Sequence, residues 1–143
     1  MALGEYFSNS QFDVIYASTL KRAHQTAIEV HKQQPTPQPP LITSPDLREQ
    51  GFGEAEGKPW TMTSDPNKSV AQLLAEGKYP VLVHRHDKFP GGESLDDLRM
   101  RAHKAVQEII MPHIWEAAQE GKKGVHLAIV SHGLCISEVR TTF

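Results

Sequence analysis

The sequence predicts an α/β fold in which a mostly parallel sheet carries helices on both faces. Val14–Ala27 contains a short run of β-forming residues, then a tight turn and a helical pattern, and Val125–Arg140 repeats this order. The nearly continuous apolar run Val125–Val130 is typical of a parallel strand that is buried on both faces. Strands that alternate with helices in this way form parallel sheets, so we expect a layered α/β domain.

The composition of the chain excludes several classes of protein. The 143 residues, of which 38% are apolar, are enough for one domain with a hydrophobic core, so we expect residues 1–143 to form a single domain. A net charge of −2 provides no basic surface for nucleic acid or for an anionic membrane. The single cysteine, Cys135, excludes an internal disulfide and favours a cytoplasmic protein.

The turn after the first predicted strand holds the first candidate site residue. Ser18 and Thr19 are good N-cap residues, so Arg22 is expected in the first turn of the following helix. Unpaired backbone N–H groups at a helix N-terminus attract anions, and a guanidinium adds a rigid fork of donors that fits phosphate. Taken alone, Arg22 is better read as a surface charge on a solvated helix, and the phosphate reading depends on the other motifs.

The segments on either side of this unit have simpler signatures. Residues 1–9 resemble the last turns of a helix with one apolar face. The five prolines of residues 31–47 predict a stiff loop, with room for an edge strand at Leu41–Thr43. Residues 47–60 combine glycines with Glu49, Glu54 and Glu56, a pattern that fits either a carboxyl held over a pocket or a solvated polar loop.

The middle of the chain predicts a short helix and an extended segment. Asp65-Pro66 is expected to cap a helix that ends at Gly77. His84 and His86 lie two residues apart, on one face if their segment is a strand. This spacing admits a metal hydrolase as a weaker alternative function, but the sequence places no third ligand beside the two histidines.

A long helix is predicted from Ser94, with Asp97 at the position of a capping-box acid. Its apolar residues recur at helical spacing, which indicates core packing: Leu95, Leu98, Ala102, Ala105, Val106, Ile109 and Ile110. Pro112 is expected to kink or break this helix. Gly121 and Gly124 are expected to end it.

The turns that follow the two predicted strands are expected to lie at the same edge of the sheet. His132 follows the second apolar strand as Arg22 follows the first, and ligands of open parallel sheets bind outside the carboxyl ends of the strands. A guanidinium, an imidazole and two helix N-termini form a pocket that suits a dianion, and we expect a phosphoryl group there. A core histidine that is satisfied by the backbone is the alternative reading of His132 alone.

Four motifs, YASTLKRAHQTA, LREQGFGEAEGK, FPGGES and IVSHG, resemble in this order the histidine phosphatase superfamily, in its phosphoglycerate mutase-like branch. The resemblance implies phosphoryl transfer through a phosphohistidine, with no cofactor and no metal. It also implies roles for individual residues. Arg22 would bind phosphate, Glu49 would be the general acid and base, and His132 would stabilise the transferring phosphoryl group, while Glu93 and Ser94 would lie close to the substrate.

One feature departs from the family pattern. The family's nucleophile is a histidine in an Arg-His-Gly motif on the first strand, and the 143 residues contain no such tripeptide. The chain therefore resembles a member shortened at both ends. We expect it to bind a phosphorylated small molecule or phosphoprotein with little turnover. Phosphatase and mutase lineages both remain open, and a non-catalytic interaction domain is the alternative.

The same departure leads to an expectation about assembly. We place the family's first strand between Val14–Ala17 and Val125–Val130, so that these two strands lack a shared neighbour. Unpaired strand edges recruit other chains. The two strands then either pair directly or associate with a second chain, and we expect the homodimer.

Overall fold

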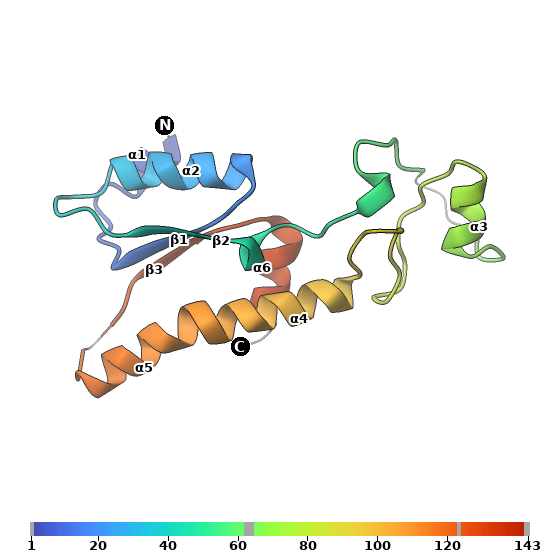
Figure 1. The fold of residues 1–143 in the computed structure, drawn as a ribbon. Coiled ribbons are helices and arrows are strands. Elements are labelled where there is room, and N and C mark those ends of the chain that lie inside the picture. Colours follow the sequence, from blue (N-terminus) through green and yellow to red (C-terminus); the bar gives the residue numbers. More distant parts are fainter. Residues whose placement is uncertain (1, 62–64, 123, 142–143) are drawn as a thin grey trace. The chain divides into compact units, whose positions relative to one another are not determined.

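A computed structural model describes residues 2–61, 65–122 and 124–141. The chain divides into two compact units, of which unit 1 comprises Met1–Glu49 with Arg101–Phe143 and unit 2 comprises Gln50–Met100. Unit 1 contains the sheet, and unit 2 contains a short helix with several loops (Figure 1). Among the described residues, no helix is both long enough and apolar enough to cross a membrane.

The sheet of unit 1 has three parallel strands in the order β2-β1-β3. They are β1 (Val14–Ser18), β2 (Leu41–Ser44) and β3 (Leu127–Val130). Ile15 of β1 lies opposite Leu41 on one side and Ala128 on the other. The predicted parallel α/β architecture is therefore confirmed, and β2 is an edge strand, as the proline-rich loop before it indicated.

Helices precede, connect and follow these strands. They are α1 (Ala2–Tyr6), α2 (Lys21–Lys32), α3 (Val70–Ala75), α4 (Leu95–Ala105), α5 (Met111–Gln119) and α6 (Gly133–Arg140). Two short 3₁₀ turns, Pro45–Leu47 and Gly53–Ala55, and one π-helical turn, Val106–Ile110, complete the set.

The alternation of β1 explains why helices cover both faces of the sheet. Ile15 and Ala17 point to one face and pack against Ala27 and Val30 of α2. Tyr16 points to the opposite face, where its hydroxyl lies 2.8 Å from a ring nitrogen of His113 in α5. Figure 1 shows the same layering, with α1 and α2 on one side of the strands and α5 on the other.

β1 and β3 are direct neighbours, with Tyr16 opposite Ile129 and Ala17 opposite Val130. Of the two arrangements that the sequence left open for these strands, the structure has direct pairing, in which each residue of β3 has a partner in β1. The expectation that Val125–Val130 is buried on both faces is wrong. β3 lies at the edge of the sheet, and its four residues are half-buried.

The start of α2 differs from the prediction. Leu20 is the N-cap and no side chain caps the helix, so the assignment of Ser18 and Thr19 as caps is wrong. Ser18 is instead the last residue of β1, where its hydroxyl accepts a hydrogen bond from the Leu20 N–H at 3.1 Å. Arg22 is nevertheless the second residue of the helix, as the sequence indicated.

Pro112 changes the helix without ending it. The π-helical turn Val106–Ile110 joins α4 to α5, and Ile110 and Met111 keep right-handed helical dihedral angles. Pro112 lies in the first turn of α5, where a missing N–H is tolerated. The expected kink or break thus takes the form of a π turn, which changes the hydrogen-bond spacing before the proline.

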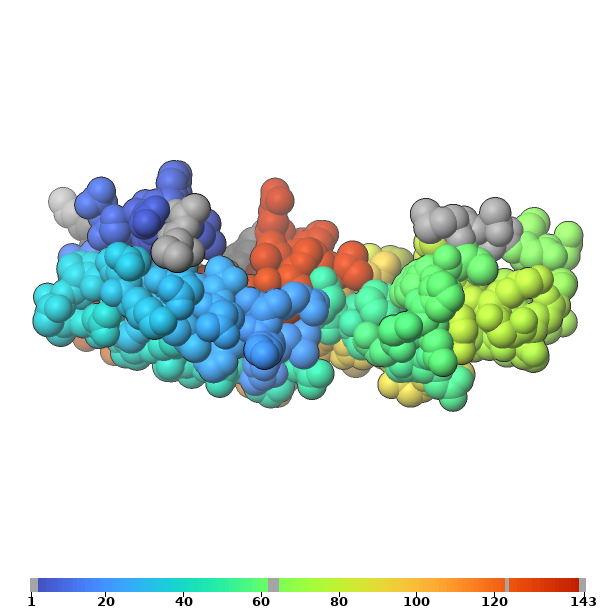
Figure 2. Space-filling model, turned by 90° about the horizontal axis from the view of Figure 1, so that it is seen from above, coloured from blue at the N-terminus to red at the C-terminus, as the bar shows by residue number. Residues whose placement is uncertain are grey.

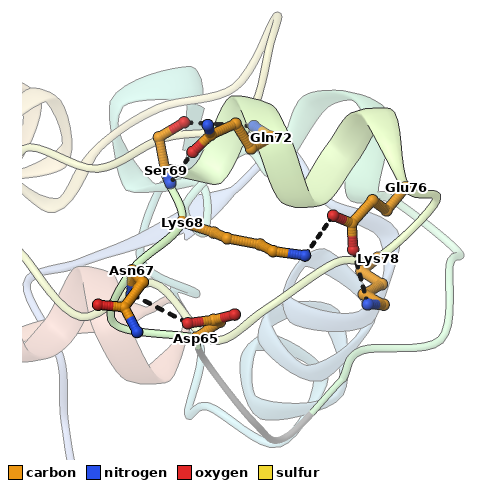
Figure 3. Close-up of polar contacts among 7 residues, drawn as sticks. All are labelled: Asp65, Asn67, Lys68, Ser69, Gln72, Glu76 and Lys78. Carbon is orange, nitrogen blue, oxygen red and sulfur yellow. Dashed lines mark hydrogen bonds and ion pairs between the residues drawn. The ribbon is translucent and has the colours of Figure 1, made fainter.

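In unit 2, α3 starts later than Asp65-Pro66 suggested. Ser69 is its N-cap, and a capping box joins Ser69 to Gln72 (Figure 3). The Gln72 N–H donates to Ser69 Oγ at 3.3 Å, and the Ser69 N–H donates to Gln72 Oε1 at 2.7 Å. Gly77, with a φ of +71°, follows the helix as predicted.

The C-terminal end of α3 carries an exposed ion-pair group. Glu76 pairs with both Lys68 and Lys78 (Figure 3). Hydrogen bonds from Lys68 and then Lys78 lower the pKa of Glu76 to about 2. Because all three side chains are exposed, this group contributes little to the free energy of unfolding.

The start of α4 agrees with the predicted capping box. The Asp97 N–H donates to Ser94 Oγ at 3.0 Å, and the Ser94 N–H donates to Asp97 Oδ2 at 3.0 Å. The bond from the Ser94 backbone, followed by the one from Lys88, lowers the pKa of Asp97 to about 2. Reciprocal bonds of this kind satisfy two of the unpaired donors at a helix start.

Candidate functional site

A cavity of about 760 Å³ lies within unit 1, beside β3. Its apolar wall includes Phe7, Phe12 and Ile136, and its polar lining includes Arg22 and His132. Figure 2, seen from above, shows the blue segment of α2 next to the orange-red segment of α6, the two helices that contribute Arg22 and Ile136 to the lining. The half-buried strand β3 thus borders a groove that is apolar along its length and polar at one end.

Arg22 and His132 are in direct contact at the polar end. Arg22 Nε donates to His132 Nδ1 at 3.1 Å. His132 lies two residues after the end of β3, at the N-cap of α6, and is 7% exposed, whereas Arg22 is exposed on the first turn of α2. The structure therefore brings together the two residues that the sequence placed at the carboxyl ends of neighbouring strands.

The surroundings of His132 favour its neutral form. Burial lowers the pKa of the imidazole, and the adjacent Arg22 guanidinium lowers that pKa further. Glu49 opposes this shift, while Arg101 adds to it. At neutral pH the ring is therefore an uncharged hydrogen-bonding group beside a permanent cation.

Glu49 lines the same cavity and contacts the start of α6. Its carboxylate accepts hydrogen bonds from the backbone N–H groups of Cys135, at 3.1 Å, and Leu134, at 3.4 Å. A carboxylate at this position complements the positive end of the helix. In this arrangement the N–H groups of α6 that the sequence assigned to an anion are bonded to Glu49.

Two residues that the sequence did not single out hold the loop before Glu49. The Arg101 guanidinium donates to the backbone carbonyls of Asp46, Arg48 and Glu49 at 3.0, 2.8 and 3.2 Å. Ser131 Oγ donates to the Leu47 carbonyl at 2.7 Å. The sequence indicates only that Arg101 lies in a helix, because hydrogen bonds over 52 or more residues leave no local pattern.

Ser18 was predicted only as a helix cap, yet it contacts the site. Its hydroxyl oxygen lies 2.9 Å from His132 Nε2, and the side chain is fully buried at 0% exposure. The ring of His132 is therefore bonded at both nitrogens, to Arg22 on one side and to Ser18 on the other.

Glu93 and Ser94 belong to unit 2, where the structure gives them local contacts. The Glu93 carboxylate accepts from the Gly51 N–H at 2.9 Å, and the Glu93 N–H donates to the Gly51 carbonyl at 2.7 Å. Ser94 is buried and caps α4. Their nearness to a substrate stays a prediction.

His84 and His86 also belong to unit 2. Their rings stack with centroids 5.5 Å apart, and both side chains are exposed beside a cavity of about 850 Å³ that Lys68 and Lys88 also line. Within the described ranges, no group of three or more His, Cys, Asp or Glu side chains is arranged to hold a metal ion.

The chain matches one protein family and several curated proteins. The family model of the histidine phosphatase superfamily (branch 1) matches residues 1–142. A metal-independent phosphoserine phosphatase of Arabidopsis thaliana is 31% identical over 83% of this chain and 43% of its own length. Fructose-2,6-bisphosphatase TIGAR B of Danio rerio is 29% identical over 94% of this chain and 57% of its own length. The chain thus spans about half the length of these curated relatives.

A solved structure of a mycobacterial glucosyl-3-phosphoglycerate phosphatase has the same fold. It superimposes with a TM-score of 0.65 and 21% identity, over 98% of this chain and 61% of that chain. At this identity the similarity supports the architecture of the sheet and its helices, and it carries no information on substrate.

Proposed function

The chain belongs to the histidine phosphatase superfamily, and from that premise we propose that the cavity beside β3 binds the phosphoryl group of a phosphate ester. The contact between Arg22 and His132 is the observation that carries this proposal. A guanidinium retains donors for a phosphate after giving its Nε–H to a neighbour. The imidazole beside it becomes a further donor when it takes up a proton at Nδ1.

Glu49 is proposed as the general acid and base of the site. It lines the same cavity, and a carboxyl group there is able to protonate the oxygen of a leaving alcohol. To do so, the carboxyl must share or leave the N–H groups of Leu134 and Cys135. Covalent phosphoryl transfer also needs a nucleophile, and the 143 residues contain no Arg-His-Gly tripeptide. The proposal for these residues alone is therefore phosphate-ester binding with little turnover.

The substrate class is proposed from the chemistry of the cavity and from the names of the relatives. A phosphorylated small molecule fits a groove that is apolar along its length and cationic at one end, and the relatives named above act on phosphoserine and on a sugar bisphosphate. A phosphoprotein and a mutase reaction remain alternatives. The single, buried Cys135 supports a cytoplasmic location.

Replacing Arg22 by glutamine is expected to weaken binding of inorganic phosphate by about 10- to 100-fold, because a charge-assisted hydrogen bond contributes about 1.5–3 kcal/mol. Titration calorimetry with inorganic phosphate measures the change. Lys21→Gln is the matched control, since Lys21 is an exposed cation next in sequence that does not line the cavity. Equal phosphate affinities in the two variants would mean that Arg22 acts only through its net charge. If the unsubstituted protein bound no phosphate, the alternative of a non-catalytic interaction domain would be favoured.

The outer edge of β3 leads to a proposal about assembly. Its residues Leu127–Val130 are apolar but only half-buried, and β1 is the strand with which β3 is paired. An edge of this kind presents N–H and C=O groups to a further strand. We propose that two copies of the chain associate through this edge. Sedimentation equilibrium at low micromolar concentration is expected to show a dimer, and a monomer over the whole accessible concentration range would contradict the proposal.

A further inference from the structure

The two nitrogens of the His132 ring have partners of different chemical character. Arg22 Nε lies 3.1 Å from Nδ1, and Ser18 Oγ lies 2.9 Å from Nε2. A guanidinium has donors only, whereas a serine hydroxyl both donates and accepts. The partner of Nδ1 therefore determines the protonation of the whole ring.

Because Arg22 donates, His132 Nδ1 must accept and carries no hydrogen. A neutral imidazole with a bare Nδ1 has its hydrogen on Nε2, so Nε2–H donates to Ser18 Oγ. Ser18 Oγ then accepts two hydrogen bonds, from His132 and from the Leu20 N–H at 3.1 Å. The Leu20 N–H belongs to the turn that starts α2, and its hydrogen bond holds the Ser18 hydroxyl oxygen next to the His132 ring.

We propose that Ser18 is a positioning residue which holds His132 in the Nε2–H tautomer and so keeps the Nδ1 lone pair directed at Arg22. This inference rests on the proposed function of Arg22 and His132 as the phosphate site. It makes Nδ1 the ring atom that takes up a proton from solvent when a phosphate dianion binds, a step that ends the hydrogen bond from Arg22 Nε, while Nε2 stays bonded to Ser18.

Because Ser18 and His132 are both buried, the hydrogen bond of Nε2–H depends on the Ser18 hydroxyl. Ser18 is 0% exposed and His132 is 7% exposed, so solvent does not readily replace the hydroxyl as partner of Nε2–H. Without Ser18, the Nε2–H tautomer keeps the bond to Arg22 but leaves a buried donor unsatisfied. The Nδ1–H tautomer removes that donor but loses the bond to Arg22. The preference for one tautomer therefore falls when the hydroxyl is removed.

The test is the ¹⁵N NMR spectrum of the His132 ring in the whole chain, recorded above its pKa. Unsubstituted protein is expected to show a protonated Nε2 and an unprotonated Nδ1. Ser18→Ala is expected to move both nitrogens toward averaged positions and to weaken phosphate binding by about 3- to 10-fold, the effect of a neutral hydrogen bond. Ser18→Thr, which retains a hydroxyl, is expected to restore both. Ser131→Ala is the matched control for the ring signals, because Ser131 bonds to the Leu47 carbonyl.

The outcomes separate this inference from the proposed function. A protonated Nδ1 in the unsubstituted protein overturns the inference without any variant. Ring signals that are the same in folded Ser18→Ala and in unsubstituted protein also overturn it, even if phosphate binding depends on Arg22. The predicted tautomer together with its loss in Ser18→Ala supports the positioning role. If phosphate then fails to bind, the proposed function is wrong and the positioning of the ring stands.

Discussion

Replacing Glu49 by glutamine is expected to lower turnover of a phosphate monoester by about 10²- to 10⁴-fold, the range that a general acid contributes. The measurement requires a protein that carries these residues together with an Arg-His-Gly nucleophile. Glutamine preserves the shape of the side chain and one acceptor oxygen, so it keeps the hydrogen bond from either the Cys135 or the Leu134 N–H, which donate to separate oxygens of Glu49. It cannot deliver a proton, so turnover should fall far more than phosphate affinity.

Glu54→Gln provides the control for Glu49→Gln. Glu54 is an exposed acid of the same glycine-containing stretch, and its substitution is expected to leave both turnover and affinity within about twofold. Steady-state kinetics with para-nitrophenyl phosphate measures the first quantity, and competition with inorganic phosphate measures the second. If Glu49→Gln turned over substrate at the original rate, Glu49 would have no place in the proposed reaction.

Replacing Arg101 by methionine is expected to lower the free energy of unfolding by about 2–4 kcal/mol, because it leaves three backbone carbonyls without their charged donor. Methionine keeps an unbranched apolar stem, so loss of packing contributes little. The carbonyls belong to Asp46, Arg48 and Glu49, and the loop that carries Glu49 should therefore loosen before the sheet does.

Urea denaturation measures the stability change for Arg101→Met, and hydrogen exchange of residues 46–49 measures the loosening. Arg99→Met is the matched control, since Arg99 is an exposed arginine in the same helix, and its effect is expected to stay within about 0.5 kcal/mol. Equal denaturation midpoints for the two variants would contradict the stabilising role given to Arg101.

Sequence reasoning located Arg22 and His132 for a reason that is independent of detailed packing. Both residues follow apolar strands, and the carboxyl ends of parallel strands share one edge of a sheet. The 3.1 Å contact between them follows from that topology, because β1 and β3 are neighbours. The parallel sheet and the capping box at Ser94 were predictable because local periodicity and cap chemistry determine them.

The order of the strands was not predictable in the same way. Apolar runs show that Val14–Ser18 and Leu127–Val130 are strands, but they contain no information on which strand lies beside which. The contacts of Arg101 with the Glu49 loop and of Ser18 with His132 also depend on residues that are far apart in sequence. A serine between a strand and a helix is typical of a helix cap, so the local pattern at Ser18 predicted a cap and gave no indication of its contact with His132.

The central claim is that phosphate binds at the polar end of the cavity beside β3, and an NMR titration with inorganic phosphate tests it most directly. The ring signals of all histidines are followed in one experiment. His132 is expected to respond, and this response is expected to be lost in Arg22→Gln, whereas His84 and His86 of the lysine-lined cavity in unit 2 are expected not to respond. A titration that shifts His84 and His86 and leaves His132 unchanged would contradict the account.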